Sequence, residues 1–309
     1  MTEALVISIL AASITAGTPI LFAALGELIA ERSGIMNLGV DGMMLVGAVT
    51  GFMVTVNTGN AWAGVLASLA AGAALALIHA CLTVTLRANQ VVSGLALTLF
   101  GTGLANYLGK GYVGMRIENS FGKMAIPGLS EIPIIGQVIF KQDILVYISY
   151  LLIALAGFYL YKTRAGLFLR AVGENPAAVD SVGVNVFRLR YIYVMIGGAL
   201  AGLGGAYLSL AYAPSWLENM TAGRGWIAVA LVIFALWDPW RALAGSYLFG
   251  GVDALGFHLQ VIGLPISIFI LNMLPYIFTI LVLVLVLIKK GGRLAAPNSL
   301  GVPYDREER

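Results

Sequence analysis

Long apolar stretches, separated by short groups of charged residues, are the feature that most constrains how this chain folds. A helix needs roughly 20 mainly apolar residues to cross about 30 Å of hydrocarbon, and here 60% of residues are hydrophobic and 11% charged. Backbone groups in a bilayer must be hydrogen-bonded within the protein, which favours helices. The sequence therefore predicts an all-α polytopic membrane protein. Its expected spans cover residues 4–29, 35–57, 61–86, 91–109, 144–161, 191–212, 223–237, 241–262 and 266–288.

Two of these nine spans are weak, so the expected number is eight to ten. The first contains Thr15-Ala-Gly-Thr-Pro19 at mid-depth, and the stretch 223–237 has only about 15 residues. Such interruptions are tolerated in a bilayer only where the freed backbone faces protein or a water-filled path. We therefore expect broken helices, which favour a translocation route.

Small residues recur at four-residue spacing within several expected spans. The sets are Gly47/Gly51, Gly64/Ser68/Gly72 and Gly198/Gly202. Small side chains at this spacing let two helix backbones approach closely. We expect these positions to pack the bundle.

Basic residues fall on alternate connections between the expected spans, and cytoplasmic loops carry an excess of Lys and Arg. These residues are Arg32, Arg87, Lys162, Arg164, Arg170, Arg188, Arg190, Arg241, Lys289, Lys290 and Arg293. The pattern predicts an N-terminus outside and a C-terminus in the cytoplasm. Residues 1–290 would then form one transmembrane domain, with an external loop at 110–143, a cytoplasmic loop at 162–190 and a cytoplasmic tail at 291–309.

Motifs for soluble chemistry are absent from the sequence. No Gly-x-x-x-x-Gly-Lys-Ser/Thr loop occurs, so we expect no ATP binding by a P-loop. The two histidines, His79 and His258, lie in separate spans, where we expect each to be hydrogen-bonded, and Cys81 lies in an apolar run as an expected core residue. We expect no catalytic residue, metal or cofactor in this chain, and no nucleic-acid partner.

Polar side chains inside apolar spans are costly in hydrocarbon and need a partner or a purpose. Asn37 and Asp41 are four residues apart and would share one face of a helix that neighbouring glycines loosen. One interpretation is a broken helix that lines a pathway. The other places Asp41 at the cytoplasmic end, where its charge favours a helix N-terminus and pairs with a basic neighbour such as Arg32. The further pathway candidates are Gln90, Ser93, Thr98, Asn106 and Trp226.

The loop 162–190 contains a short element with helix signals at both ends. Asn175 is a good N-cap, Pro176 suits the first helical position and Gly183 is a natural stop. A two-turn helix is marginal alone in water, so it needs a surface to pack on. Local physics leaves two surfaces open, namely the protein's own spans or a separate cytoplasmic protein.

Four runs of sequence carry a family resemblance. They are Glu31-Arg-Ser-Gly-Ile-Met-Asn-Leu-Gly-Val-Asp-Gly-Met-Met-Leu-Val-Gly-Ala48, Val92-Ser-Gly-Leu-Ala-Leu-Thr98, Arg170-Ala-Val-Gly-Glu-Asn-Pro176 and Thr221-Ala-Gly-Arg-Gly-Trp-Ile-Ala-Val-Ala-Leu-Val232. Over nearly its whole length the chain resembles the permease subunits of bacterial ABC importers, in the branch of ribose-type sugar and branched-chain amino-acid permeases. Within that branch the combination resembles the permeases of nucleoside importers that use a basic-membrane-protein lipoprotein receptor, and simple-sugar permeases.

The resemblance implies a pseudo-symmetric pair of permeases in the bacterial cytoplasmic membrane, commonly two different chains. It also implies a cytoplasmic ATPase, which would hold ATP and Mg, and a lipoprotein receptor outside. Gly173-Glu-Asn-Pro176 matches the family's coupling region, which docks in a cleft of the ATPase, and Arg170 and Glu174 would add polar contacts. We therefore expect an ATP-driven importer of nucleosides, or alternatively of a simple sugar, that works by alternating access.

Two other classes of protein remain open at this point. A secondary transporter normally has ionisable groups at mid-membrane to couple ions, and only Asp41, Asp253 and His258 are available for that purpose. A membrane-embedded enzyme would need a reactive set of side chains, which the sequence does not show.

Overall fold

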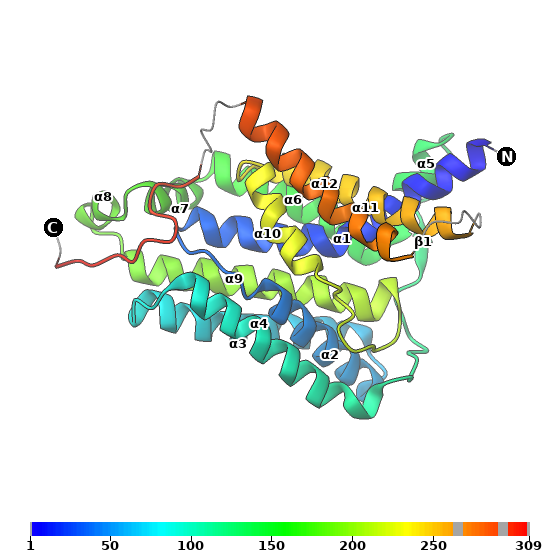
Figure 1. Ribbon diagram of the computed structural model, residues 1–309, viewed down its shortest axis with the longest axis horizontal. Coiled ribbons are helices and arrows are strands. Elements are labelled where there is room, and N and C mark those ends of the chain that lie inside the picture. The colour runs from blue at the N-terminus through cyan, green and yellow to red at the C-terminus, as the bar shows by residue number, and fades with distance from the viewer. Residues whose placement is uncertain (1, 262–267, 290–295, 308–309) are drawn as a thin grey trace.

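The computed structural model describes residues 2–261, 268–289 and 296–307, and its regular structure is almost entirely helical (Figure 1). The helices are α1 (Thr2–Arg32), α2 (Val40–Thr58), α3 (Ala61–Ala80), α4 (Gln90–Gly109), α5 (Ile135–Ile139), α6 (Ile144–Lys162), α7 (Arg164–Glu174), α8 (Pro176–Ser181), α9 (Val186–Tyr207), α10 (Arg224–Phe234), α11 (Pro239–Val261) and α12 (Ile268–Lys289). Single π-helical turns follow α3 at Cys81–Thr85 and α9 at Leu208–Tyr212, and a 3-10 turn covers Lys110–Tyr112. The short strands β1 (Lys123–Ala125) and β2 (Lys141–Asp143) pair antiparallel.

Each of the nine predicted stretches overlaps a helix, and residues 262, 266 and 267 of these stretches fall outside the described part of the chain. Within the described residues, six helical segments are long and apolar enough to cross a membrane, and they are Ala4–Arg32, Val40–Thr58, Ala61–Thr85, Gln90–Tyr112, Ile144–Lys162 and Val186–Tyr212. Helix α10 is apolar but has only 11 residues, so it is about 16 Å long, roughly half the hydrocarbon thickness. The chain is thus a polytopic helical membrane protein, while the predicted number of nine spans is not confirmed.

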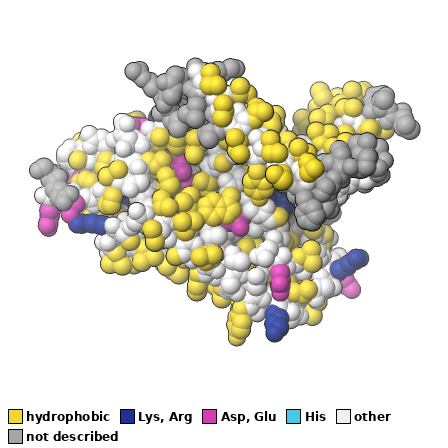
Figure 2. All heavy atoms as spheres, in the orientation of Figure 1, with side chains coloured by type: hydrophobic (Ala, Val, Ile, Leu, Met, Phe, Trp, Pro, Cys, Tyr) yellow, Lys and Arg dark blue, Asp and Glu magenta, His cyan; other side chains and the backbone are white. Residues whose placement is uncertain are grey.

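Helix α1 runs through the middle of the bundle. It packs against α9, α10 and α11, and α9 in turn packs against α2 and α3. Figure 1 shows α10, α11 and α12 on one side of α1 and α9, α2, α3 and α4 on the other. In Figure 2 hydrophobic side chains cover much of the visible face, and only a few Lys, Arg, Asp and Glu side chains are scattered over it. This distribution suits a bundle whose flank contacts lipid.

Small residues set the distance between the central helices. Gly47 of α2 and Gly202 of α9 face each other, and Gly72 of α3 lies against Gly198 and Gly202, so that a side-chain carbon at any of these positions would collide with the opposite backbone. The Ser68 hydroxyl donates a hydrogen bond to the Gly47 carbonyl at 2.7 Å. The prediction that four-residue spacing of small residues packs the bundle is therefore confirmed.

Two predicted interruptions differ from the structure. The helix predicted from residue 35 begins only at Val40, and the left-handed Gly34, with a φ of +88°, separates segment 35–39 from the end of α1. Asn37 is therefore outside any helix, and its expected helical face shared with Asp41 is wrong. The predicted interruption of the first span is also wrong, since α1 continues through Pro19. This part of α1 packs closely on α11, where Gly17 lies against the backbone of Ser246.

The two ends of the bundle carry different elements. Helices α7 and α8 and the C-terminal segment lie at one end, here called the α7–α8 end, while the N-terminus, α5 and β1 lie at the opposite end, here called the α5 end (Figure 1). Cys81, predicted to be a core residue, is exposed on α3's side of the bundle. An apolar side chain facing lipid costs no more than one facing protein, so the apolar run around it did not identify the core.

Candidate functional site

The backbone from residue 33 to residue 39, here called segment 33–39, is non-helical and largely buried between α1 and α2. Because unpaired backbone groups are costly in hydrocarbon, non-helical backbone at membrane depth needs protein partners. The Met36 N–H donates to Oε1 of Gln90 at 2.7 Å, and the Asn37 N–H donates to Oε1 of Glu27 at 2.8 Å. The Asn37 side chain itself accepts from the Gly39 N–H at 3.0 Å. Side-chain oxygens thus replace the missing helical bonds.

Carbonyl groups of the same segment are also satisfied by side chains. Thr98 of α4 donates to the Leu38 carbonyl at 2.8 Å. His79 of α3 places Nε2 3.0 Å from the Met36 carbonyl and Nδ1 2.9 Å from Oγ of Ser93. A neutral ring that donates from Nε2 to the carbonyl can accept the serine proton at Nδ1. The structure therefore brings four of the predicted pathway residues together around one buried segment.

Asp41 lies in the first turn of α2 and caps the N-terminus of a different helix, α10. One carboxylate oxygen accepts from the Gly225 N–H at 2.9 Å and the other accepts from the Thr221 hydroxyl at 3.2 Å. The N-cap residue of α10 is Gly223, which has no side chain to do this. A carboxylate at this position satisfies an unpaired N–H and favours the positive end of the helix dipole.

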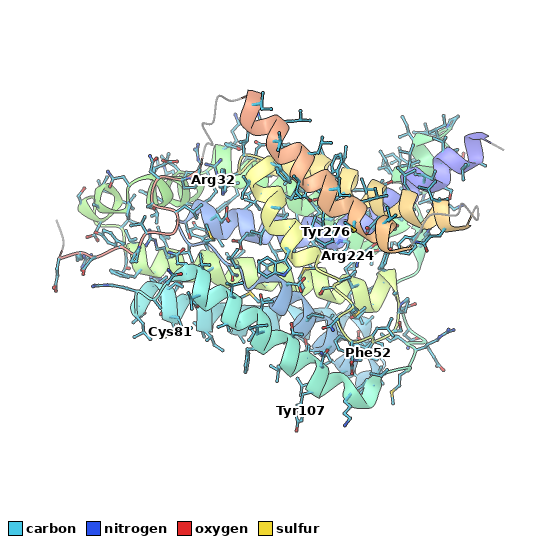
Figure 3. All side chains as sticks on the ribbon, in the orientation of Figure 1. Arg32, Phe52, Cys81, Tyr107, Arg224 and Tyr276 are labelled. Atoms are coloured by element: carbon cyan, nitrogen blue, oxygen red, sulfur yellow. The ribbon has the colours of Figure 1, made fainter. Side chains whose placement is uncertain are left out.

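Charged and aromatic side chains surround the same helix start. Arg224 forms a salt bridge with Asp253 of α11 at 3.0 Å, and its guanidinium lies 5.7 Å from the centre of the Tyr212 ring. Tyr276 of α12 donates to the Ala222 carbonyl at 3.1 Å. Figure 3 shows Arg224 and Tyr276 close together where α10 meets α12. Elements α2, α10, α11 and α12 are thus joined by polar contacts at one place in the bundle.

The remaining two pathway candidates lie apart from these groups. Trp226 is next to the capped Gly225 on α10 and is 37% exposed. Asn106 lies two turns beyond Thr98 on α4, and among the described residues its buried Oδ1 has no hydrogen-bond partner. Neither contributes to the bonds that hold segment 33–39.

Two buried acids on α1 were not singled out from the sequence. Glu27 and Glu31 are one helical turn apart and each is 1% exposed. Glu31 accepts from Nε1 of Trp237 at 2.5 Å, and the neighbouring Arg32 donates to the Trp237 carbonyl at 2.9 Å. The suggested pairing of Arg32 with Asp41 is therefore wrong. Two acids in an apolar span were the available signal, because such groups are rare in hydrocarbon.

Both histidines form hydrogen bonds within the bundle, as predicted. His258 of α11 places Nδ1 2.8 Å from the Ala254 carbonyl and Nε2 3.1 Å from the Ser8 hydroxyl, and His79 has the partners given above. In the part of the chain that the structure describes, no three His, Cys, Asp or Glu residues come together to hold a metal ion.

The predicted loop 162–190 contains two helices, α7 and α8, while its last residues already belong to α9, which begins at Val186. Asn175 ends α7 and caps α8, since its Oδ1 accepts from the Ala178 N–H at 3.0 Å. Pro176 occupies the first position of α8, and Gly183 has a φ of +83° just after it. The predicted short helix and both of its end signals are therefore confirmed, whereas α7 was not predicted.

Helix α8 packs on the protein's own chain. Val179 is buried in a small cluster with Val172, Val186 and Tyr304. Val182, just after α8, is 69% exposed. The sequence left two surfaces open for the short helix, namely the protein's own chain or a separate protein. The chain itself supplies the first, and the exposed side chain of Val182 remains beside α8.

The predicted coupling residues divide between interior and surface. Arg170 stacks on Tyr161, with its guanidinium 5.6 Å from the ring centre, and Gly173 is buried against the end of α1. Glu174 is exposed, and its Oε2 accepts from the amide of Asn298 at 2.8 Å. Asn175 and Pro176 form the junction between the two helices. Arg170 and Gly173 thus build this end, while Glu174 lies on its surface.

Comparison with known proteins places these features in a family. The profile of the family described as branched-chain amino acid transport system / permease component matches residues 9–288. The putative glucose ABC transporter permease protein TsgC13 of Haloferax volcanii is 45% identical over 97% of this chain and 98% of its own length. The guanosine ABC transporter permease protein NupQ of Bacillus subtilis is 37% identical over 97% of each chain, and the nucleoside ABC transporter permease protein NupC of Lactococcus lactis is 36% identical over 93% of each.

Two of these organisms also contain a more distant relative with a matching name. The guanosine ABC transporter permease protein NupP of Bacillus subtilis is 24% identical over 76% of this chain, and the glucose ABC transporter permease protein TsgB13 of Haloferax volcanii is 26% identical over 70%. Permeases of these names therefore occur in pairs. The matched region includes segment 33–39, the capped start of α10 and helices α7 and α8, and this protein belongs to the family of branched-chain amino acid transport system permease components.

Proposed function

We propose that this chain is the transmembrane permease subunit of an ABC importer that carries nucleosides across the cytoplasmic membrane. Its relatives are permease subunits, and it is a transport component rather than an enzyme. The observation that carries the nucleoside assignment is similarity over at least 93% of the chain to two permeases named for guanosine and for nucleosides.

The proposed mechanism is alternating access, in which the bundle switches the side on which its pathway is open. Helices α2 and α10 each follow a non-helical stretch, and Asp41 joins their N-termini. Discontinuous helices of this kind place binding sites and moving parts inside transporter bundles. The joined starts of α2 and α10 would therefore move together when the pathway changes.

The hydrogen bonds of the site divide the predicted pathway residues into two roles. Oε1 of Gln90 and the hydroxyls of Ser93 and Thr98 bond segment 33–39 or His79, so these residues would shape the pathway wall by holding that segment. Trp226 has an exposed ring that could stack on a nucleobase. Neutral polar and aromatic groups suit a nucleoside, whose hydroxyls and ring need hydrogen bonds and stacking rather than charge pairing.

The proposed transporter contains further subunits. A cytoplasmic ATPase would bind ATP and Mg and dock on the α7–α8 end, and an external lipoprotein receptor would deliver the substrate at the α5 end. The paired names of the relatives support a second, homologous permease chain. In this proposed arrangement the N-terminus would lie outside and the C-terminus in the cytoplasm.

Uptake by the reconstituted complex tests the proposal. Proteoliposomes would contain this permease, its ATPase, its second permease and its receptor, and labelled guanosine would be supplied on the receptor side. We expect uptake that requires ATP hydrolysis and persists in the presence of a protonophore, with a catalytically inactive ATPase as the control. Uptake that continues without ATP and collapses with the proton gradient would instead identify a secondary transporter.

Glucose is the second candidate substrate, because the putative glucose permease of Haloferax volcanii is 45% identical to this chain. The same vesicles distinguish the two substrates when labelled guanosine and labelled glucose are each tested against an excess of the other, unlabelled. A nucleoside importer accumulates guanosine and ignores glucose. The opposite result would reassign the substrate while keeping the ATP-driven mechanism.

A further inference from the structure

The C-terminal segment Ala296–Glu307, here called the tail, crosses the α7–α8 end of the molecule (Figure 1). It forms no helix or strand, yet it makes hydrogen bonds to three parts of the chain that are far apart in sequence. An irregular segment that is hydrogen-bonded at this many points has a defined position on the bundle.

The first contact closes the C-terminus of α7. The last carbonyl groups of a helix lack partners within that helix. The Ser299 N–H donates to the Gly173 carbonyl at 2.8 Å, and its hydroxyl lies 2.7 Å from the same oxygen and 3.1 Å from the Val172 carbonyl. Asn298 donates to Glu174. The tail therefore supplies hydrogen-bond donors for the end of α7.

The second contact reaches segment 33–39. The Gly301 N–H donates to the Gly34 carbonyl at 3.2 Å. Arg190 of α9, which is 2% exposed, donates to the Ser33 carbonyl at 3.1 Å and to Oγ of Ser299 at 3.3 Å. The start of segment 33–39 and the end of α7 are thus bonded to tail residues that are only two positions apart.

The third contact fixes the far end of the tail. Tyr304 donates to Asp180 of α8 at 3.1 Å, and Arg306 pairs with the same carboxylate through its Nε at 2.8 Å. Asp305 forms a salt bridge with Arg87 in the connection between α3 and α4. The tail is therefore attached to both helices of the α7–α8 end and to the neighbouring part of the bundle.

We propose that the tail is a coupling strap in which Ser299 and Gly301 act as positioning residues that transmit movement of α7–α8 to segment 33–39. Ser299 and Gly301 can be at most about 7 Å apart. A movement that separates the end of α7 from Gly34 by more than the tail can span must therefore move Gly34 as well or break one of these hydrogen bonds. Segment 33–39 in turn contacts α3 and α4 through the side chains described above. This inference rests on the proposed function, because it assumes that the ATPase moves α7–α8.

The substitution Ser299→Ala tests the strap in the reconstituted complex. It removes the hydroxyl that contacts α7 and Arg190, and the matched control Ser181→Ala removes a hydroxyl that bonds only within its own helix, to the Ala178 carbonyl. We expect Ser299→Ala to hydrolyse ATP while substrate uptake per ATP falls about fivefold, the lower end of typical coupling effects. Ser181→Ala should keep the wild-type ratio. An unchanged ratio in Ser299→Ala would overturn the proposal.

A charge reversal keeps the test valid if Ser299→Ala fails to assemble. Arg87→Asp and Asp305→Arg each break the salt bridge of the tail, and the double variant restores it in the opposite sense. We expect each single variant to lower uptake per ATP and the double variant to recover it, whereas Glu307→Lys, a charge change at an exposed tail position, should have no effect. Singles that match wild type, or a double that fails to recover, would contradict the strap.

Hydrogen exchange separates failure of the strap from failure of the proposed function, because it does not depend on transport. In the assembled complex, Ser299→Ala should speed amide exchange in residues 164–181 and in segment 33–39 together, relative to Ser181→Ala. Faster exchange confined to the tail and α7 would mean that the tail only caps α7, and this result would overturn the proposal of a strap. If the wild-type complex shows no ATP-dependent uptake, the proposed function is what fails.

Discussion

At the scale of single residues, several buried polar side chains of this bundle hydrogen-bond its own backbone. Gln90 and Thr98 were predicted to face a pathway, and the structure shows their oxygens on the backbone of segment 33–39. Asp41 likewise accepts a hydrogen bond from an N–H group of α10, 184 positions away in the sequence. In hydrocarbon the cost of an unpaired backbone group exceeds the cost of using a side chain to satisfy it. A polar residue in a span is therefore first a candidate partner for irregular backbone.

The cap on α10 predicts different effects for two substitutions of Asp41. Asp41→Ala leaves the Gly225 N–H unpaired and should lower the free energy of unfolding by about 1–2 kcal/mol, the usual cost of losing an N-cap. Asp41→Asn keeps an oxygen that can accept from Gly225 and should retain most of this stability. Unfolding of both purified variants in detergent, followed by tryptophan fluorescence, measures the difference. Equal stability of the two variants would show that the cap contributes nothing.

Asp143, at the α5 end just before α6, should make stability depend on pH. Its carboxylate accepts from the Leu145 and Val146 N–H groups and from the Tyr207 hydroxyl. Burial raises the pKa of Asp143 above its usual value, although these hydrogen bonds oppose the shift. The folded protein therefore binds this proton more tightly than the unfolded chain, and its contribution to stability falls as pH rises from about 3.9 through the raised pKa.

The variant Asp143→Asn checks this sign. It keeps an accepting oxygen for the N-terminus of α6 but cannot ionise. We expect its unfolding free energy to change less between pH 4 and neutral pH than that of the wild type, measured in one detergent at constant ionic strength. A wild type whose stability instead rises more steeply than the variant's over this range would mean that the carboxylate is favoured by folding.

At the scale of helices, the closest contacts depend on residues without side chains. The backbones of α2, α3 and α9 meet at Gly47, Gly72, Gly198 and Gly202. Dispersion forces act over short distances, so this approach gives the three helices contact along their backbones. The three helices are therefore held at a fixed spacing, while the starts of α2 and α10 are held by side-chain hydrogen bonds.

Two glycine substitutions should have opposite effects. A side-chain carbon at Gly202 would overlap the Ser68 carbonyl, so Gly202→Ala should cost about 1–3 kcal/mol through overpacking. At Gly103 in α4 nothing lies within 4 Å of an added carbon, so Gly103→Ala should be neutral or should stabilise the helix by up to about 1 kcal/mol. Thermal unfolding in detergent compares them directly. Similar transition temperatures for both variants would contradict the close-packing argument.

At the scale of the whole molecule, the α7–α8 end presents the surface expected to meet an ATPase. Val182 is 69% exposed beside α8, and Val302 of the tail is 55% exposed at the same end. We expect Val182→Asp to weaken co-purification of the ATPase by about tenfold or more, since a charge in an apolar contact costs at least about 1.4 kcal/mol. Val302→Asp places the same charge on the tail instead of beside α8, so as the control it should bind normally. If both variants retain the ATPase fully, α8 does not form the docking surface.

The sequence predicted those parts of the fold that local pattern determines. Apolar length located nine helices, and the Asn175, Pro176 and Gly183 signals located α8, because both depend on neighbouring residues. The tail contacts, the α10 cap and the roles of Glu27 and Glu31 were missed, because they pair residues far apart in the chain. Apolar composition also could not separate Cys81, which is exposed, from core residues, since lipid and protein interior are equally apolar.

The brevity of α10 has a consequence for how this protein enters the membrane. An 11-residue helix is too short to be inserted as an independent segment. It is joined to α11 by a short turn in which Leu236 and Trp237 both have positive φ, and the two helices are in contact. We expect the membrane-insertion machinery to release α10 and α11 into the bilayer as one unit. Helix α1 would already be in place, so that the Trp237 indole can donate its hydrogen bond to Glu31. The order of synthesis would then be part of what gives this bundle its shape.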